Sequence, residues 1–274
     1  MSSILTNNGA MVALQTLRGI NSNLSKTQDE ISTGKSVATA KDNAAVWAIA
    51  KTMETDVQLN KTIQSGLNVA GAVVGTARSG AERVTGLLQE MKNLALAASN
   101  DTADFDKIDA DVQAKLKQAI DVIASSKMSG LNLLATDVNG SGATSFAVAT
   151  SIDGGTATSL TIDGVDLEAT VATVTAISDG TSAATALGEI ETMLNASIDA
   201  AASLGTTGKR LNDQSDFVTA LSDSLKAGVG SLVDADMEET SARLQALQTQ
   251  QQLAIQSLSM ANKAPQNILA LFRG

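Results

Sequence analysis

The sequence predicts a mainly α-helical fold, in which long heptad helices form an antiparallel coiled-coil bundle with a small β-hairpin region. Apolar residues recur at alternating intervals of three and four along most of the 274 residues, the spacing of helices packed along a seam. Aromatic residues make up 2% of the chain and tyrosine is absent, so a sheet-rich core is not expected. From about residue 140 to 180, glycine, threonine and aspartate replace the helical pattern and favour β-structure.

The first predicted helix ends near Gly34, and polar residues interrupt its seam. The seam positions step by four and three: Ala10, Leu14, Leu17, Asn21, Leu24, Gln28 and Ile31. A loop over residues 34–43 leads to a longer helix with an unbroken stripe: Ile63, Leu67, Ala70, Val74, Ala77, Ala81, Val84, Leu88, Met91 and Ala95. That helix also holds five glycines, each costing about 1 kcal/mol relative to alanine: Gly66, Gly71, Gly75, Gly80 and Gly86. We expect these glycines to let neighbouring helices approach closely.

The middle of the chain begins with a helix predicted over residues 103–128, capped by residues 99–101. Its apolar face comprises Phe105, Ile108, Val112, Leu116, Ala119 and Ile123. Residues 160–167 then alternate about an Asp163–Gly164 turn, which predicts a hairpin.

Heptads resume at Leu187 and continue to Leu225, through Ile190, Leu194, Ser197, Ala201, Leu204, Gly208, Leu211, Ser215 and Val218. Residues 228–231 are predicted to be a linker. The last helix repeats the pattern of the first: Met237, Thr240, Leu244, Leu247, Gln251, Ala254, Leu258 and Ala261. Both ends of the chain are therefore heptad helices with interrupted seams.

Interrupted seams predict ends that gain order on association. Ordering about 70 terminal residues costs on the order of 70–140 kcal/mol of backbone entropy. Two weak seams that pair only with each other hardly offset this cost. We therefore expect the ends to be disordered in the monomer and to fold when many copies bury their stripes together.

The composition excludes most enzyme chemistry. Cysteine and histidine are absent, which removes thiol nucleophiles, imidazole bases, disulfides and the common zinc and haem ligands. Residues 33–36 resemble the end of a phosphate-binding loop, but Asp29 stands where that motif needs glycine. The aspartates between Asp101 and Asp111 lack calcium-loop spacing and suit a helix start. We expect no enzymatic activity, no cofactor and no metal.

The net charge of −10 is concentrated in the middle of the chain. Residues 101–200 carry 15 acidic and 4 basic side chains, so the remainder is nearly neutral. This distribution argues against nucleic acid as a partner and lets the ends pack against copies of themselves. No apolar run is long enough for a membrane span, and the first eleven residues do not resemble a secretory signal peptide, so export is expected by another route.

Two segments resemble the terminal signatures of bacterial flagellins. Residues 30–50, EISTGKSVATAKDNAAVWAIA, are similar to R-L-S-S-G-x-x-I-N-S-A-K-D-D-A-A-G-x-A-I, and residues 234–273 are similar to D-A-D … A-N-Q-x-P-Q-N-V-L-x-L-L-R. The matching residues include Gly34, Lys41, Asp42, Ala44, Ala45, Asp234, Asp236, Asn262, Pro265, Gln266, Asn267 and Arg273. The chain departs from the pattern at Asn43 and Trp47 and in a very short variable region.

The resemblance implies a secreted structural subunit that polymerises into the extracellular flagellar filament for motility. Its implied partners are copies of itself, an export chaperone, the type III export apparatus, the filament cap and junction proteins. Residues 1–44 and 228–274 would form the inner domain, whose helices pair in the filament, and residues 45–227 the helical domain with the hairpin. The implied self-assembly residues are Leu14, Leu17, Leu24, Ile31, Leu244, Leu247, Leu258, Leu269, Leu271 and Phe272. A hook–filament junction protein of the same family is the alternative, with a helical adhesin a more distant one.

Residues 89–96 depart from the family in a stretch that a Toll-like receptor reads in many flagellins. The segment QEMKNLAL aligns with Q-R-V-R-E-L-A-V, but Glu90 replaces the first arginine and Asn93 the acidic residue. Arginine is well suited to bidentate interface contacts, so its loss removes an anchor. We therefore expect weak or no Toll-like receptor activation.

Overall fold

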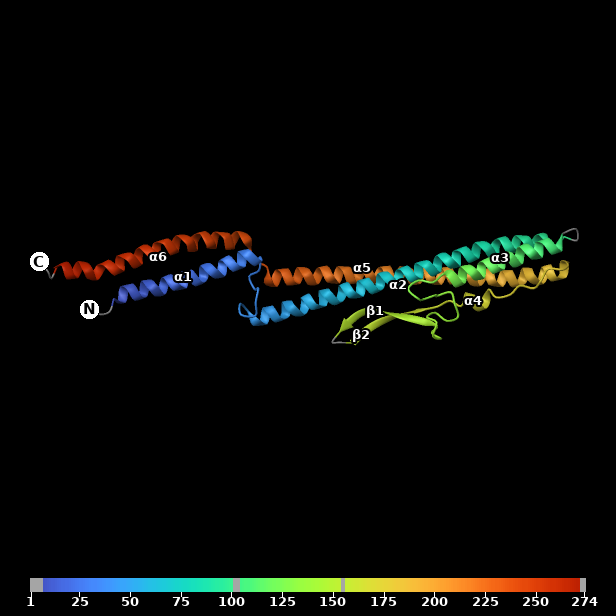
Figure 1. Ribbon diagram of the computed structural model, residues 1–274, viewed down its shortest axis with the longest axis horizontal. Coiled ribbons are helices and arrows are strands. Elements are labelled where there is room, and N and C mark those ends of the chain that lie inside the picture. Colours follow the sequence, from blue (N-terminus) through green and yellow to red (C-terminus); the bar gives the residue numbers. More distant parts are fainter. Residues whose placement is uncertain (1–6, 101–103, 154–155, 272–274) are drawn as a thin grey trace. The chain divides into compact units, whose positions relative to one another are not determined.

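The computed structural model describes residues 7–100, 104–153 and 156–271, which divide into two compact units. The first unit comprises Met1–Asp56 and Ser224–Gly274, and the second comprises Val57–Asp223. The elements are α1 (Asn8–Thr33), α2 (Ala44–Ala97), α3 (Phe105–Ser125), β1 (Ser145–Asp153), β2 (Thr156–Asp163), α4 (Leu167–Thr170), α5 (Gly180–Val233) and α6 (Met237–Leu271) (Figure 1). The mainly helical fold with a single small hairpin region agrees with the prediction for these residues.

In the second unit, α2 and α5 run antiparallel. Gln64 Nε2 donates a hydrogen bond to Thr219 Oγ1 at 2.6 Å, while Lys92 Nζ lies 3.2 Å from Glu191 Oε1. All ten predicted stripe residues of α2, from Ile63 to Ala95, are buried. The heptad spacing therefore identified the core face of this helix.

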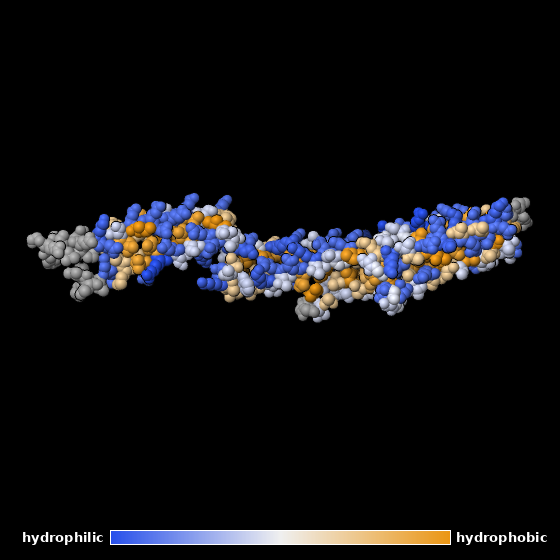
Figure 2. All heavy atoms as spheres, in the orientation of Figure 1, coloured by the Kyte–Doolittle hydropathy of each residue, from blue (hydrophilic) through white to orange (hydrophobic). Residues whose placement is uncertain are grey.

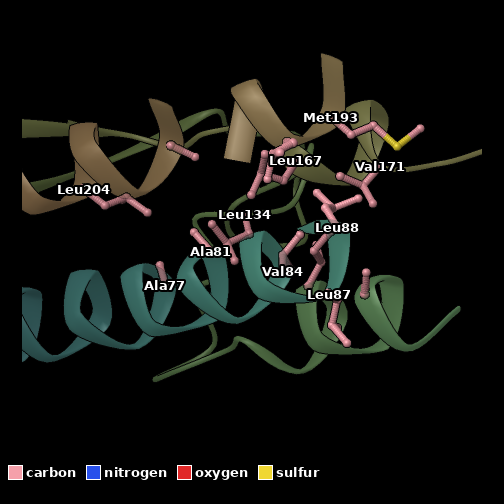
Figure 3. Close-up of a cluster of buried hydrophobic side chains, with 14 of the residues drawn as sticks. Ala77, Ala81, Val84, Leu87, Leu88, Leu134, Leu167, Val171, Met193 and Leu204 are labelled. Atoms are coloured by element: carbon pink, nitrogen blue, oxygen red, sulfur yellow. The ribbon is translucent and has the colours of Figure 1, made fainter. Parts of the chain in front are cut away.

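The core of the second unit also includes the segment that follows α3. In Figure 3, Val84 and Leu88 of α2 lie near Leu134 and Leu167, and Leu204 of α5 faces α2 farther along the helix, toward Ala77. All of these side chains are buried. Full burial of a leucine or valine contributes about 1.5–3 kcal/mol, so this layer is a main source of stability in the unit.

The glycines of α2 have different surroundings. A Cβ at Gly80 would overlap Ser126 Oγ and come within 2.9 Å of Leu134 Cδ1, so glycine is required there for close packing. At three other positions a Cβ would meet no atom within 4 Å: Gly71, Gly75 and Gly86. The close approach at Gly80 is to the residue after the end of α3 and to the segment that follows it, not to a neighbouring helix, and at the other three glycines the described parts of the chain make no close approach.

The hairpin lies earlier in the chain than its predicted turn. β1 pairs antiparallel with β2, with Asp153 opposite Thr156 and an irregularity between Ala149 and Ser151. The predicted Asp163–Gly164 turn is wrong, because β2 ends at Asp163 and the chain continues into the core. Gly164 N donates to Thr144 O at 2.8 Å, and a Cβ there would meet Val138 Cγ2 at 2.6 Å, so the glycine serves a close approach instead.

Two predicted helix boundaries also differ from the structure. The cap of α3 is Asp104, whose side chain accepts a hydrogen bond from Lys107 N, not a residue of 99–101. The linker predicted at residues 228–231 is wrong, because α5 continues to Val233, a buried residue. Glycine lowers helix propensity but does not end a helix that packing supports. The break falls after Val233 instead.

Candidate assembly surface on the terminal helices

The terminal helices α1 and α6 pack against each other antiparallel within the first unit (Figure 1). Asn7 Nδ2 donates to the carbonyl oxygen of Ala261 at 2.8 Å, and Gln251 Nε2 donates to Asn21 Oδ1 at 2.7 Å. Asn7 also caps α1, since its Oδ1 accepts a hydrogen bond from Ala10 N at 3.1 Å. The two ends of the sequence thus meet along a shared seam.

The covered face of α1 is rotated from the predicted seam. The covered face and the predicted seam share four half-buried positions: Ala10, Leu17, Leu24 and Ile31. Between them, the covered positions are Ala13, Ile20 and Thr27, in place of Leu14, Asn21 and Gln28. Thr27 is buried, whereas Leu14 is 39% exposed. Both sets have heptad spacing, so spacing alone did not distinguish them, and Ile20 was the available signal for the correct one.

The covered face of α6 follows the predicted spacing. Its buried or half-buried positions are Thr240, Leu244, Leu247, Gln251, Ala254, Leu258 and Ala261, whereas Met237 is exposed. Leu269 and Leu271 lie in the helix with side chains outside the described residues, and Phe272 lies outside them entirely.

The seam between α1 and α6 buries few side chains. Thr27 is the buried residue of α1, and Thr240 and Leu247 are those of the described part of α6. Burial of apolar surface is the main favourable term in folding, whereas fixing each residue costs about 1–2 kcal/mol of backbone entropy. The pair therefore contributes little stability by itself.

Apolar side chains also lie on the outer surface of these helices. Met11 and Val12 on α1 are more than half exposed, and on α6 Leu253 is 59% and Met260 is 68% exposed. Figure 2 shows apolar residues at the surface over this pair. Ala246, Leu253 and Met260 are seven residues apart, so they form a second line along α6. Sequence reasoning followed one seam and missed this line, although its seven-residue spacing was visible.

The two signature segments meet at the break between helices. Gly34 ends α1 in the left-handed conformation with φ of +68°, as predicted for a helix ending near this glycine. Its carbonyl oxygen accepts a hydrogen bond from Ala235 N at 3.0 Å, and Ser36 N donates to Val233 O at 2.7 Å. Asp234 pairs with Lys35 in an isolated β-bridge. These backbone contacts join the amino-terminal loop to the start of the carboxyl-terminal segment.

Several signature residues stabilise chain turns and helix starts. Asp42 accepts hydrogen bonds from Thr39 N at 2.9 Å and Thr39 Oγ1 at 3.0 Å, and these bonds hold the pKa of the carboxyl below its usual value. Asn43 Oδ1 accepts from Val46 N at 3.2 Å, so the departure from aspartate preserves a capping side chain. Asp236 Oδ1 accepts from two backbone amides at the start of α6.

The other signature residues make fewer described contacts. The exposed positions are Lys41, Ala44, Ala45 and Asn262. The side chains of Pro265, Gln266 and Asn267 lie outside the described part of the chain, and Arg273 lies outside it entirely. Their role in assembly therefore rests on the sequence.

A polar groove of about 770 Å³ lies between α1 and the loop over residues 34–42. Lys35, on this loop, has its Nζ 3.4 Å from Glu54 Oε1. Lys51, on α2, has its Nζ 2.5 Å from Glu54 Oε2. The hydrogen bond from Lys51 is the main cause that lowers the pKa of Glu54. The positive charge of Lys35 is thus balanced by the carboxylate of Glu54, whereas the lysine of a phosphate-binding loop pairs with the phosphate.

Within the described residues, no group of three or more carboxylates is placed to hold a metal ion. Over the same part of the chain, no helix combines the length and the apolar character that crossing a bilayer requires.

Glu90 has a partner within the second unit. Its carboxylate forms an ion pair with Lys115 of α3, and the hydrogen bond from Lys115 lowers the pKa of Glu90. The acidic residue in the receptor-like segment is therefore held against α3.

Known proteins resemble this chain over its whole length. Residues 4–139 match the bacterial flagellin N-terminal helical region, and residues 187–272 match the bacterial flagellin C-terminal helical region. Flagellin FljM of Caulobacter vibrioides is 38% identical over 100% of this chain and 99% of the relative, and a flagellin of Brucella melitensis is 37% identical over 100% of both. A Bacillus cereus flagellin structure covers 56% of this chain and 88% of that chain, with a TM-score of 0.50 at 18% identity, and so shows likeness of fold.

The fold and the paired terminal helices define a helical structural protein with apolar surface at both ends of its sequence. The chain belongs to the bacterial flagellins. It is a structural subunit of the extracellular flagellar filament, which serves motility. The family polymerises with copies of itself.

Proposed function

We propose that this chain is a major filament subunit and that its copies assemble through the terminal helices. The observation that carries this proposal is the outer apolar line on α6, where Leu253 and Met260 are largely exposed in the single chain. Such a line gains free energy when neighbouring copies cover it. The contact is head-to-tail, because a heterologous interface that does not close yields a filament instead of a ring.

The inner domain of residues 1–44 and 228–274 is proposed to gain order during assembly. The small number of buried side chains between α1 and α6 supports this view. The self-assembly residues include those covered within the chain, such as Leu17 and Leu247, and the exposed Leu14. Residues 45–227 form the helical domain that persists in the monomer.

The remaining partners follow from the family. Export through the type III apparatus with a chaperone requires a chain that can be threaded unfolded, and the absence of cysteine removes disulfides as an obstacle. Assembly beneath a cap and next to junction proteins follows from polymerisation outside the cell. We assign the chain a structural role without enzymatic activity.

The proposal of a major subunit is tested by adding purified monomer to short filament seeds and imaging the product. Extended filaments are expected, together with high abundance of this chain in filaments sheared from cells. A protein that caps seeds without extending them, at a few copies per filament, would instead be the junction protein.

Removal of residues 264–274 tests the role of the carboxyl-terminal end. Leu269, Leu271 and Phe272 are lost, so we expect a monomer that does not extend seeds. Circular dichroism should show that the helical domain remains folded. Filaments of normal length from the truncated chain would overturn the proposed role of this end.

We also propose weak or absent Toll-like receptor activation. Glu90 stands at the arginine position of the receptor-like segment, and its ion pair with Lys115 uses the carboxylate within the chain. A receptor surface that matches arginine would face a negative charge, which is repulsive or leaves its acceptors unpaired.

A further inference from the structure

The second unit has a surface groove between α2 and α5 that is kept open by glycines. It holds about 430 Å³, and its glycines are Gly71 and Gly75 on α2 and Gly205 and Gly208 on α5. A Cβ at Gly71, Gly75 or Gly205 would meet no atom within 4 Å. These residues lower helix propensity without bringing described segments of the chain closer together. Their effect within the chain is to leave the groove empty of side chains.

The floor and rim of the groove have different chemistry. Leu67 and Leu204 in the floor are buried apolar side chains, whereas Arg78 and Lys209 supply positive charge at the lining. Arg78 Nε lies 3.6 Å from Glu82 Oε1, and no ion pair of Lys209 is found within the described residues. Because Leu67 and Leu204 are only 2% and 1% exposed, the accessible lining is glycine backbone and polar side chains. An aromatic ring placed there gains chiefly from cation–π attraction to Arg78 and Lys209.

The chain itself has an exposed aromatic side chain on α5. Phe217 on α5 is 61% exposed, and Leu221, one turn further on, is 40% exposed. Gln214, three residues before Phe217, donates from Nε2 to Thr150 O at 3.3 Å, which places this side of α5 toward the hairpin. Gly208 lies nine residues before Phe217, or two and a half turns, and so on the opposite side of the helix.

We propose that Phe217 of one copy inserts into the glycine groove of a neighbouring copy in the filament. The groove volume is within the range of pockets that hold small organic molecules, so it admits a phenyl ring. Because the inserted residue and the groove lie on opposite sides of α5, each copy uses one surface of each kind. The contact is therefore heterologous, the kind of interface that an extending filament requires. This inference rests on the proposed assembly of the chain.

The test compares seeded assembly of four full-length variants with that of the unmodified chain. Phe217→Ala removes the inserted ring, Gly75→Leu fills the groove, and a third variant combines them. Gly86→Leu is the matched control, because Gly86 is also a half-buried α2 glycine with open space at its Cβ but does not line the groove. The critical concentration for extension is measured for each, with the monomer melting temperature as a check on folding.

We expect each single groove or ring variant to raise the critical concentration about tenfold or more, as for loss of an interface anchor. The double variant should resemble the single ones, because both changes remove the same contact. Gly86→Leu should assemble normally, and no leucine variant should lower the melting temperature, since leucine has the higher helix propensity.

The proposal is overturned if either single variant assembles as the unmodified chain does, or if Gly86→Leu is equally impaired. It is also overturned if the two effects multiply in the double variant, since independent contacts behave in that way. A failure of the unmodified chain to extend seeds would instead count against the proposed function.

Discussion

At the residue scale, several residues of the two flagellin signature segments act as helix stops and caps. Gly34 adopts a left-handed conformation that glycine alone accepts without cost, and its carbonyl is bonded by Ala235 N. Asn43 and Asp236 accept hydrogen bonds from amides at the starts of α2 and α6. The stop at Gly34 could be predicted, because the heptads end there. The pairing with Ala235 could not, since contacts 200 residues apart leave no local pattern.

Asp42 should titrate below its usual range. Its carboxylate accepts hydrogen bonds from the amide and hydroxyl of Thr39, which favour the charged form. Because the folded pKa is depressed, the stabilisation is complete above the unfolded value of about 3.9 and is lost as pH falls through the folded pKa. Carboxyl chemical shifts followed against pH give this value directly. In Thr39→Ala the Asp42 pKa should rise, and an unchanged value would show that the hydroxyl has no part in the shift.

Replacement of Glu90 by arginine should require a second change for full effect. Glu90→Arg alone places two cations together at Lys115, whereas Glu90→Arg with Lys115→Glu restores an opposite-charge pair. In a reporter-cell dose response, the unmodified monomer should be weak and the double variant stronger. Lys115→Glu alone is the control and should stay weak. Potency of the unmodified protein equal to that of a flagellin with the complete segment would contradict the assignment.

At the element scale, heptad spacing predicted core faces well where burial is deep. All ten stripe residues of α2 are buried, because one continuous face contacts α5 and the segment after α3. Predictions from the sequence were wrong where contacts between distant segments, and not local spacing, determine the covered face or the end of a helix. The α1 seam is shifted because two heptad sets overlap there, and α5 continues through the predicted linker to the buried Val233. Asp163 and Gly164 are residue types that favour a turn, but the chain continues past them to Leu167, which is buried in the core.

The two kinds of glycine in α2 should respond oppositely to alanine. Gly80→Ala forces a methyl group into Ser126 and Leu134 and should destabilise the chain by about 1–3 kcal/mol. Gly86→Ala adds a methyl group in open space and should stabilise by about 1 kcal/mol through helix propensity. Urea unfolding of both variants measures the difference. Equal effects of the same sign would contradict the packing described for Gly80.

At the scale of the whole molecule, the two units differ in how much they bury. The second unit has a contiguous apolar core, whereas the seam of α1 and α6 buries few side chains and leaves Leu253 and Met260 exposed. A unit with little buried apolar surface exchanges amide hydrogens readily, because local opening costs little free energy. We therefore expect persistent structure in the helical domain and assembly-dependent order in the terminal helices.

Amide hydrogen exchange of monomer and filament tests this central claim most directly. In the monomer, the α2 and α5 stretches of the second unit should be protected while α1 and the described length of α6 exchange rapidly. In the filament, α1 and α6 should become protected as strongly as the core of the second unit. Strong protection of α1 and α6 already in the monomer, or rapid exchange there in the filament, would contradict the account.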